Sequence, residues 1–284
     1  MIPAAFDYHR PASIEEAVRI ISDHGDEARV LAGGHSLIPL MKLRMTDLAH
    51  LVDLQGIEDL KGISETGGII TIGAMTTQHE LIESAVLLTH APIIVEAALQ
   101  IADPQVRYVG TIGGNVANGD PGNDMPGLMQ CLDATYTLVG PDGERNVPAR
   151  EFYEAAYFTA REEEEILTKI SLAVTSGGYA YEKQKRKIGD YATAAAGVLV
   201  TKDKGICSSA SVALTNLADT PIYCEEAVKA LVGSSLDPNA VDAAVKAAVD
   251  VSDPAEDNRG PIEFKKHAAS VIVRRAVERA ISRA

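Results

Sequence analysis

The hydrophobic pattern at the start of the chain predicts a small unit in which helices and strands alternate. Apolar residues at helical spacing follow Ser13, Glu16 stands three positions after that capping residue, and Gly25 ends the predicted helix. A short apolar strand follows at 28–32, then a helix at about 37–44 and a second strand at 50–54. This alternation predicts a small parallel sheet with a ligand-binding turn at its carboxyl edge.

From about residue 62 the pattern changes to hairpins, helices and a linker. It predicts hairpins around Gly67-Gly68 and Pro141-Asp142-Gly143, helices at 78–83, 89–102 and 125–132, and an alternating segment at 164–174. After the linker at 175–178, it predicts three strands (179–187, 195–201 and 206–216) and then three helices (222–232, 238–251 and 263–283). The sequence therefore predicts an α+β protein with domains at 1–176, in parts of about 1–57 and 58–176, and at 177–284.

Two glycine-rich segments stand out against this pattern. AGGHS (32–36) follows a predicted strand, and TIGGN (111–115) is followed closely by GDPGND (119–124). We expect the segment 101–124 to form turns rather than a helix, with backbone N–H groups that suit close approach of a phosphate. Neither motif matches GxGxxG or GxxxxGK[ST], and each alone is compatible with an ordinary surface loop. Two such turns closing on one pyrophosphate favour a dinucleotide site.

Composition narrows the possible functions. The net charge of −14 argues against a nucleic-acid partner, and no apolar run reaches the ~20 residues of a membrane span. No signal peptide is recognisable, which predicts a cytoplasmic protein. Three scattered cysteines cannot ligate an iron–sulfur cluster, and seven histidines lack ligand spacing, so we expect no metal on this chain. No catalytic triad or HExxH motif is present, which fits a protein whose cofactor carries the chemistry.

The glycine motifs, together with FDYHRP, GAMTTQHEL, IADPQVR and YEKQKRKIGDYATAA, resemble the flavin subunits of the molybdenum hydroxylase (xanthine dehydrogenase) family. Within that family the resemblance is to medium chains of aerobic carbon monoxide dehydrogenases. It implies a two-part FAD-binding domain, with a small parallel βαβ sheet and a mixed α/β part, and a C-terminal domain with a three-stranded antiparallel sheet and helices.

The resemblance also implies an assembly. A small iron–sulfur subunit with [2Fe-2S] clusters and a large subunit with a molybdenum–pterin cofactor would form a dimer of heterotrimers, a heterohexamer, with this chain. Its FAD would pass electrons to an acceptor such as quinone, in the cytoplasm or at the inner face of the membrane. The alternatives are a flavin subunit for aldehydes, xanthine or nicotine-type substrates, and a stand-alone flavoprotein oxidase.

Candidate cofactor-binding residues follow from the motifs and from the resemblance, and none is assigned as catalytic. Asp124 suits a ribose, because a carboxylate accepts from two vicinal hydroxyls, although it also suits the N-cap of the next helix. The resemblance places Lys183 and Tyr191 beside the flavin ring and a main-chain contact near Arg161. The candidate set is Ala32, Gly33, Gly34, His35, Ser36, Leu37, Ile101, Ala102, Thr111, Gly113, Gly114, Asn115, Asp124, Arg161, Lys183 and Tyr191.

Overall fold

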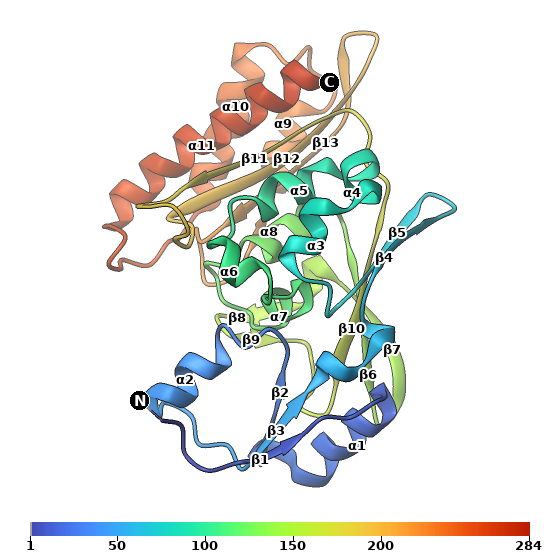
Figure 1. Ribbon diagram of the computed structural model, residues 1–284. Helices are drawn as coiled ribbons and strands as arrows, with labels where there is room; N and C mark the ends of the chain where they lie inside the picture. Colours follow the sequence, from blue (N-terminus) through green and yellow to red (C-terminus); the bar gives the residue numbers. More distant parts are fainter. Residues whose placement is uncertain (1) are drawn as a thin grey trace.

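The computed structural model describes residues 2–284, and in this part of the chain the strands form four sheets (Figure 1). The N-terminal sheet is parallel with the order β1-β3-β2, and comprises β1 (Asp7–His9), β2 (Ala28–Leu31) and β3 (His50–Asp53). Between the strands lie α1 (Ile14–His24) and α2 (Leu37–Leu43). The predicted small parallel sheet is confirmed, and β1 is a further strand that the hydrophobic pattern did not reveal.

Helix α1 shows how local sequence sets the geometry of this sheet. The Ser13 hydroxyl accepts a hydrogen bond from the Glu16 N–H at 3.2 Å, and the Glu16 carboxylate accepts from the Ala12 N–H at 2.9 Å. Gly25, with φ of 52°, ends the helix and begins η1 (Gly25–Glu27), which leads into β2. These caps direct β2 so that the first glycine motif emerges at the carboxyl edge of the sheet.

The second sheet is antiparallel with the order β4-β5-β10-β6-β7. Its strands are β4 (Ile63–Thr66), β5 (Ile69–Gly73), β6 (Thr135–Gly140), β7 (Gly143–Pro148) and β10 (Ile166–Ala173). Smaller elements of this region are η2 (Leu54–Gly56), η3 (Glu58–Leu60), η4 (Ala149–Glu151) and the hairpin of β8 (Tyr153–Ala155) and β9 (Phe158–Thr159).

Helices pack beside this sheet, and two expectations about them are wrong. They are α3 (Gln78–Glu83), α4 (Ala85–His90), α5 (Pro92–Ala98), α6 (Pro104–Arg107), α7 (Ile112–Ala117) and α8 (Asp124–Cys131). A continuous helix at 89–102 does not form, because the residue before Pro92 is disfavoured in helical conformation and α5 begins anew at that proline. The segment 101–124, expected to consist of turns, contains α6 and α7, which Asp103 and Thr111 cap with their side chains.

The C-terminal sheet is antiparallel with the order β11-β12-β13-β14. The three predicted strands are confirmed as β11 (Gly178–Gln184), β12 (Ala194–Asp203) and β13 (Ile206–Thr215), and a short fourth strand, β14 (Ile222–Tyr223), precedes α9 (Glu225–Leu231). α10 (Pro238–Val251) and α11 (Ile262–Arg283) follow, and α11 lies on one face of the sheet while α5 and α8 pack on the other (Figure 1). None of the helices described combines the length and apolar character that crossing a membrane requires.

Candidate cofactor site

A cavity of about 780 Å³ lies where the N-terminal sheet, the central helices and β11 meet, and its volume is in the usual range for small-molecule sites. The structure brings every predicted binding residue to the lining of this cavity. These are Ala32, Gly33, Gly34, His35, Ser36, Leu37, Ile101, Ala102, Thr111, Gly113, Gly114, Asn115, Asp124, Arg161, Lys183 and Tyr191. All of these residues therefore border one cavity, and their roles as cofactor contacts stay predictions.

The first glycine turn joins β2 to α2 and presents a row of backbone donors. Gly34 has φ of 75°, a conformation that favours glycine, and a Cβ on Gly33 would lie only 2.5 Å from the Val109 carbonyl oxygen. Within residues 2–284, the N–H groups of 33–37 donate to no protein acceptor. Ser36 occupies the N-cap position of α2 without a side-chain capping bond, so its hydroxyl is also available to a ligand. Such a row of N–H groups at the start of a helix suits an anion.

The second glycine turn differs from the expectation, because its N–H groups are already used within the protein. The Gly113 N–H donates to the Ala74 carbonyl at 2.8 Å, and the Gly114 N–H donates to the Thr111 hydroxyl at 3.1 Å. A Cβ on Gly113 would lie 2.5 Å from the Ala74 Cβ, and one on Gly114 would lie 3.2 Å from the Ala32 Cβ. Gly113 therefore allows close packing against the segment that follows β5, and Gly114 allows close packing against the first turn.

Asn115 connects this turn to α8. Its side-chain oxygen accepts from the Met125 N–H at 3.2 Å, and its carbonyl accepts from the Asn123 side-chain amide at 2.8 Å. Asn123 occupies the N-cap position of α8 and Asp124 is the first residue of the helix, so the alternative of Asp124 as the N-cap is wrong.

Asp124 lies in a buried cluster of charged and polar side chains. One carboxylate oxygen accepts from the Tyr181 hydroxyl at 2.7 Å, and the other accepts from the Lys183 ammonium at 2.7 Å. The side chains of Lys183 and Asp124 are only 1% and 5% exposed. Burial raises the pKa of Asp124, an effect that the Lys183 charge opposes, and burial raises the pKa of Tyr181 well above its ordinary value. Each carboxylate oxygen keeps a lone pair for a ligand such as a ribose hydroxyl.

Lys183 has one donor left over. Its ammonium carries three hydrogens, and residues 2–284 offer two acceptors, Asp124 at 2.7 Å and the Gln100 carbonyl at 3.4 Å. Because the residue also lines the cavity, the third N–H suits a polar edge of a bound ligand.

Arg161 uses its side chain to organise the loop that follows it. Its guanidinium donates to the carbonyl oxygens of Glu162 at 2.6 Å, Glu163 at 3.2 Å and Glu165 at 3.0 Å. Burial and the nearby Arg29 lower the pKa of Arg161. Arg161 lines the cavity, and the main-chain contact stays a prediction.

Tyr191 and the turn at residues 101–102 form another part of the lining. Tyr191 is 41% exposed, and the Arg259 guanidinium lies 5.5 Å from its ring centroid. Ala102 has φ of 45°, and the Arg107 guanidinium holds this turn by donating to the carbonyls of Ile101 at 2.9 Å and Ala102 at 3.3 Å. A half-exposed aromatic ring at the edge of a cavity suits packing against a planar ligand.

Gln78 is a lining residue that sequence reasoning missed. It is 2% exposed, and both polar atoms of its side-chain amide are buried without a partner among the residues described. A buried amide without hydrogen bonds is costly, so its position in the lining points to a polar ligand group. The motif GAMTTQHEL contains it, but nothing local distinguishes it from an ordinary first-turn glutamine.

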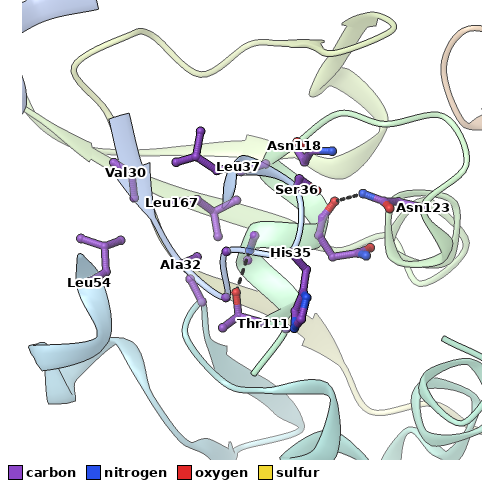
Figure 2. A pocket seen from close by; sticks show the side chains of 18 of the residues that line it. Val30, Ala32, His35, Ser36, Leu37, Leu54, Thr111, Asn118, Asn123 and Leu167 are labelled. Carbon is purple, nitrogen blue, oxygen red and sulfur yellow. Dashed lines mark hydrogen bonds between the residues drawn. The ribbon is translucent and has the colours of Figure 1, made fainter. Parts of the chain in front are cut away.

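The cavity has an apolar and a polar side (Figure 2). Val30, Leu54 and Leu167 lie on one side of the view, whereas Ser36 and Asn123 lie on the other. Sequence reasoning also missed these apolar residues, because the sequence pattern of a strand or turn does not distinguish an apolar side chain that borders a cavity from one that lies in the core. The arrangement suits a ligand with both a flat apolar part and a charged part.

Family models identify the chain. The FAD binding domain in molybdopterin dehydrogenase matches residues 4–174, and the CO dehydrogenase flavoprotein C-terminal domain matches residues 179–280. The chain belongs to this family of flavin subunits. The unpaired N–H groups of the first glycine turn and the unpartnered amide of Gln78 are consistent with a cofactor that carries a pyrophosphate and polar rings.

Two relatives and one solved structure match this flavin subunit along its whole length. The carbon monoxide dehydrogenase medium chain of Afipia carboxidovorans is 59% identical, over 100% of this chain and 99% of that protein. The 6-hydroxypseudooxynicotine dehydrogenase complex subunit alpha of Paenarthrobacter nicotinovorans is 34% identical, over 100% of this chain and 97% of that one. A chain in the crystal structure of cyanide-inactivated Cu,Mo-CO dehydrogenase superposes with a TM-score of 0.98 at 59% identity, covering 100% of both chains.

Proposed function

We propose that this chain is the FAD-carrying electron-transfer subunit of an aerobic carbon monoxide dehydrogenase. In the assembled enzyme, a molybdenum subunit would oxidise CO with water to CO₂, and an iron–sulfur subunit would relay the electrons to this chain. The observation that carries the proposal is the 59% identity over the full length to a carbon monoxide dehydrogenase medium chain, against 34% to a nicotine-type relative.

The cofactor would lie in the cavity with its pyrophosphate at the first glycine turn. The N–H groups of 33–37 and the Ser36 hydroxyl would receive the phosphate charge, while Gly114 would keep the second turn close enough to enclose it. Asp124 would accept from a ribose hydroxyl, and Gln78 would find in the cofactor the polar partner that the protein does not give it.

Lys183 and Tyr191 would bind and tune the flavin ring. FAD supplies a centre that accepts two electrons one at a time and passes them on. The remaining N–H of Lys183 would lie against the ring and stabilise negative charge on its reduced form, which raises the reduction potential. Tyr191 would pack its half-exposed ring against the flavin, with the main chain at Arg161 as a further contact.

The assembly belongs to the same proposal. A small [2Fe-2S] subunit, a large molybdenum–pterin subunit and this chain would form a dimer of heterotrimers, with quinone as the electron acceptor at the inner face of the membrane. We also propose that the chain divides into domains near residues 176 and 177, between the end of β10 and the start of β11.

Native purification of the tagged chain from its own cell tests the proposal. We expect FAD as the released flavin, two partner chains that carry iron–sulfur and molybdenum, and CO-dependent reduction of a dye. Dye reduction by a nicotine-type heterocycle, an aldehyde or xanthine instead of CO would assign the subunit to another dehydrogenase. FAD on a lone chain would favour the stand-alone oxidase, and an assembled complex without flavin would refute the central assignment.

A further inference from the structure

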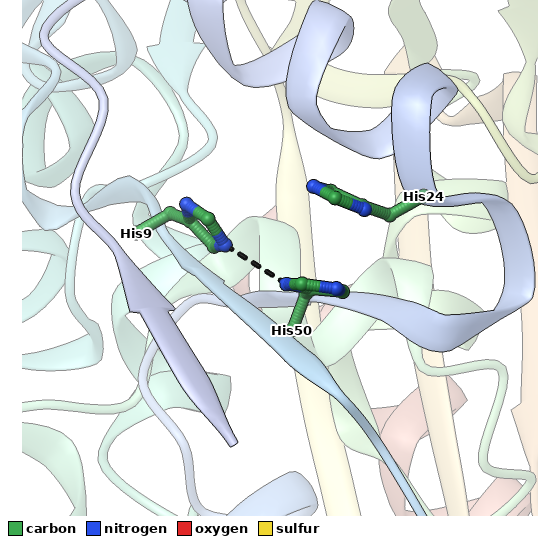
Figure 3. Close-up of side chains that lie close together, drawn as sticks. All are labelled: His9, His24 and His50. Carbon is green, nitrogen blue, oxygen red and sulfur yellow. Dashed lines mark hydrogen bonds between the residues drawn. The ribbon is translucent and has the colours of Figure 1, made fainter.

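Three histidines from separate segments meet beside the N-terminal sheet (Figure 3). His9 ends β1, His24 ends α1 and His50 begins β3. All three are partly buried, and none lines the cavity. The seven histidines lack ligand spacing in the sequence, but the fold brings these three together although the sequence separates them by 15 and 26 positions.

The rings of this histidine cluster are in direct contact. The His9 Nε2 and His50 Nδ1 atoms are 3.1 Å apart, and the His24 and His50 rings are stacked with centroids 3.6 Å apart. One ligand nitrogen from each ring lies within 4.8 Å of the others. In the hydrogen-bonded pair one nitrogen donates its proton to the lone pair of the other, so binding of one ion by both nitrogens requires loss of that shared proton.

These distances are close to those that a metal ion requires. With Zn–N bonds of about 2.0–2.1 Å in tetrahedral geometry, neighbouring ligand nitrogens lie about 3.4 Å apart. The His9–His50 pair is already at 3.1 Å, and the other nitrogens have to move by no more than about 1.4 Å. Because imidazole lone pairs lie in the ring planes, the stacked His24 and His50 rings also have to turn about their side-chain bonds until both face the ion.

A group that can serve as a fourth ligand lies next to the histidine cluster. The Asp7 carboxylate lies 3.9 Å from His50 Nδ1, on the same strand as His9, and its side chain is 80% exposed and so able to turn toward an ion. Water can take the same position, because the cluster is only partly buried. Imidazole ligands suit Zn²⁺, Cu²⁺ and Ni²⁺ and disfavour Mg²⁺ and Ca²⁺, which prefer oxygen.

We propose that His9, His24 and His50 bind one late first-row divalent metal ion, with Zn²⁺ as the representative, and that Asp7 or water completes its coordination. The ion ties β1 and the end of α1 to β3. It lies at the amino end of β3, whereas the first glycine turn leaves the carboxyl end of β2. Its role is therefore to fasten the N-terminal unit, and it takes no part in electron transfer.

The test is a Zn²⁺ titration of the purified full-length chain after treatment with a chelator, followed by calorimetry and by elemental analysis after gel filtration. We expect one Zn²⁺ per chain, and a higher midpoint of thermal unfolding when it is bound. His24→Gln and His50→Gln should each weaken binding more than tenfold, since even loss of an outer-shell partner costs about 10–100-fold in metal affinity.

His90→Gln is the matched control, because it removes an imidazole outside the cluster and should leave the affinity unchanged. If His24→Gln does not fold, His9→Gln and His50→Gln carry the same comparison, with circular dichroism as the check of folding. Binding of Zn²⁺ that is equally tight in the cluster variants and in His90→Gln would overturn the proposal, as would a wild-type chain that retains no Zn²⁺ through gel filtration.

Discussion

Replacement of Lys183 by Met tests the buried charge pair on which the site depends. The substitution removes an ammonium that lies 2.7 Å from Asp124 and leaves that carboxylate with the Tyr181 hydroxyl alone. Breaking a buried ion pair by deleting one partner typically costs about 3–5 kcal/mol. Met largely keeps the shape of the Lys side chain, so the change in the free energy of unfolding is due mainly to the removed charge.

Protonation of Asp124 limits this cost. Burial already raises the pKa of Asp124, and without the ammonium the carboxyl of the folded variant would take up a proton. Because an unfolded Asp has a pKa of about 3.9, holding it protonated at pH 7 costs about 4 kcal/mol. We therefore expect Lys183→Met to lose up to about 4 kcal/mol at pH 7.

The sign of the pH dependence follows from the same reasoning. In the variant the folded state binds a proton that the unfolded state has released, so stability rises as the pH falls, by about 1.4 kcal/mol per pH unit between pH 7 and about pH 4. At pH 5 the loss relative to wild type should shrink to about 1.5 kcal/mol.

Urea unfolding of the full-length chain, followed by circular dichroism at pH 7 and pH 5, measures both effects. Lys169→Met is the control, because Lys169 forms an exposed pair with Glu144 at 3.4 Å and should contribute only about 0–1 kcal/mol. The double variant Asp124→Asn/Lys183→Met should recover part of the loss, because it leaves no buried charge. The reasoning fails if Lys183→Met costs no more than Lys169→Met at pH 7, or if its deficit grows toward pH 5.

Three further outcomes follow from the structure. Gly114→Val places a Cβ 2.9 Å from the Thr111 hydroxyl, so the purified variant should lose FAD and keep its circular dichroism spectrum, and full flavin occupancy would contradict this. Although burial raises the pKa of Glu165, the hydrogen bond from Arg145, the hydrogen bond from the Glu162 N–H and the charges of Arg145 and Arg161 together lower that pKa. Wild type should therefore be more stable than Glu165→Gln above pH 4.5. The stability advantage of wild type should disappear as the pH falls below 4.5 and passes the lowered pKa of Glu165 in the folded protein. Urea unfolding of both proteins at several pH values measures this, and a difference in midpoint that does not change with pH would contradict it. Burial raises the pKa of the Cys131 thiol to about 11, so a thiol reagent at pH 8 should modify this residue only after unfolding, as peptide mapping would show.

The N-terminal sheet could be predicted from sequence because its signals are local. Ser13, Glu16 and Gly25 define α1 by contacts within a few residues, and the apolar runs on either side of the glycine motif become β2 and β3. Part of the cavity lining was likewise available, because the two glycine motifs and the resemblance point to residues that line it, whereas Gln78 and the apolar Val30, Leu54 and Leu167 were not predicted.

Long-range contacts explain what the sequence did not show. The Thr111 cap of the TIGGN helix is a local signal, whereas the packing of Gly113 against Ala74 joins two separate segments. The hydrogen bond from Tyr181 to Asp124 joins residues 57 positions apart, and the hydrophobic periodicity of the sequence does not predict such a contact. The buried amide of Gln78 becomes notable only when the structure shows that it lacks a partner.

The two glycine turns therefore serve the cavity in different ways. The first turn leaves its N–H groups from 33 to 37 without protein acceptors, as a phosphate-binding segment should. In the second turn, the N–H groups of Gly113 and Gly114 already donate to Ala74 and Thr111. These glycines therefore matter because they carry no side chain. Because Gly33 meets Val109 and Gly114 meets Ala32, each turn fixes the position of the other. A side chain at either glycine thus separates the turns and displaces the donors, even where it touches no cofactor atom.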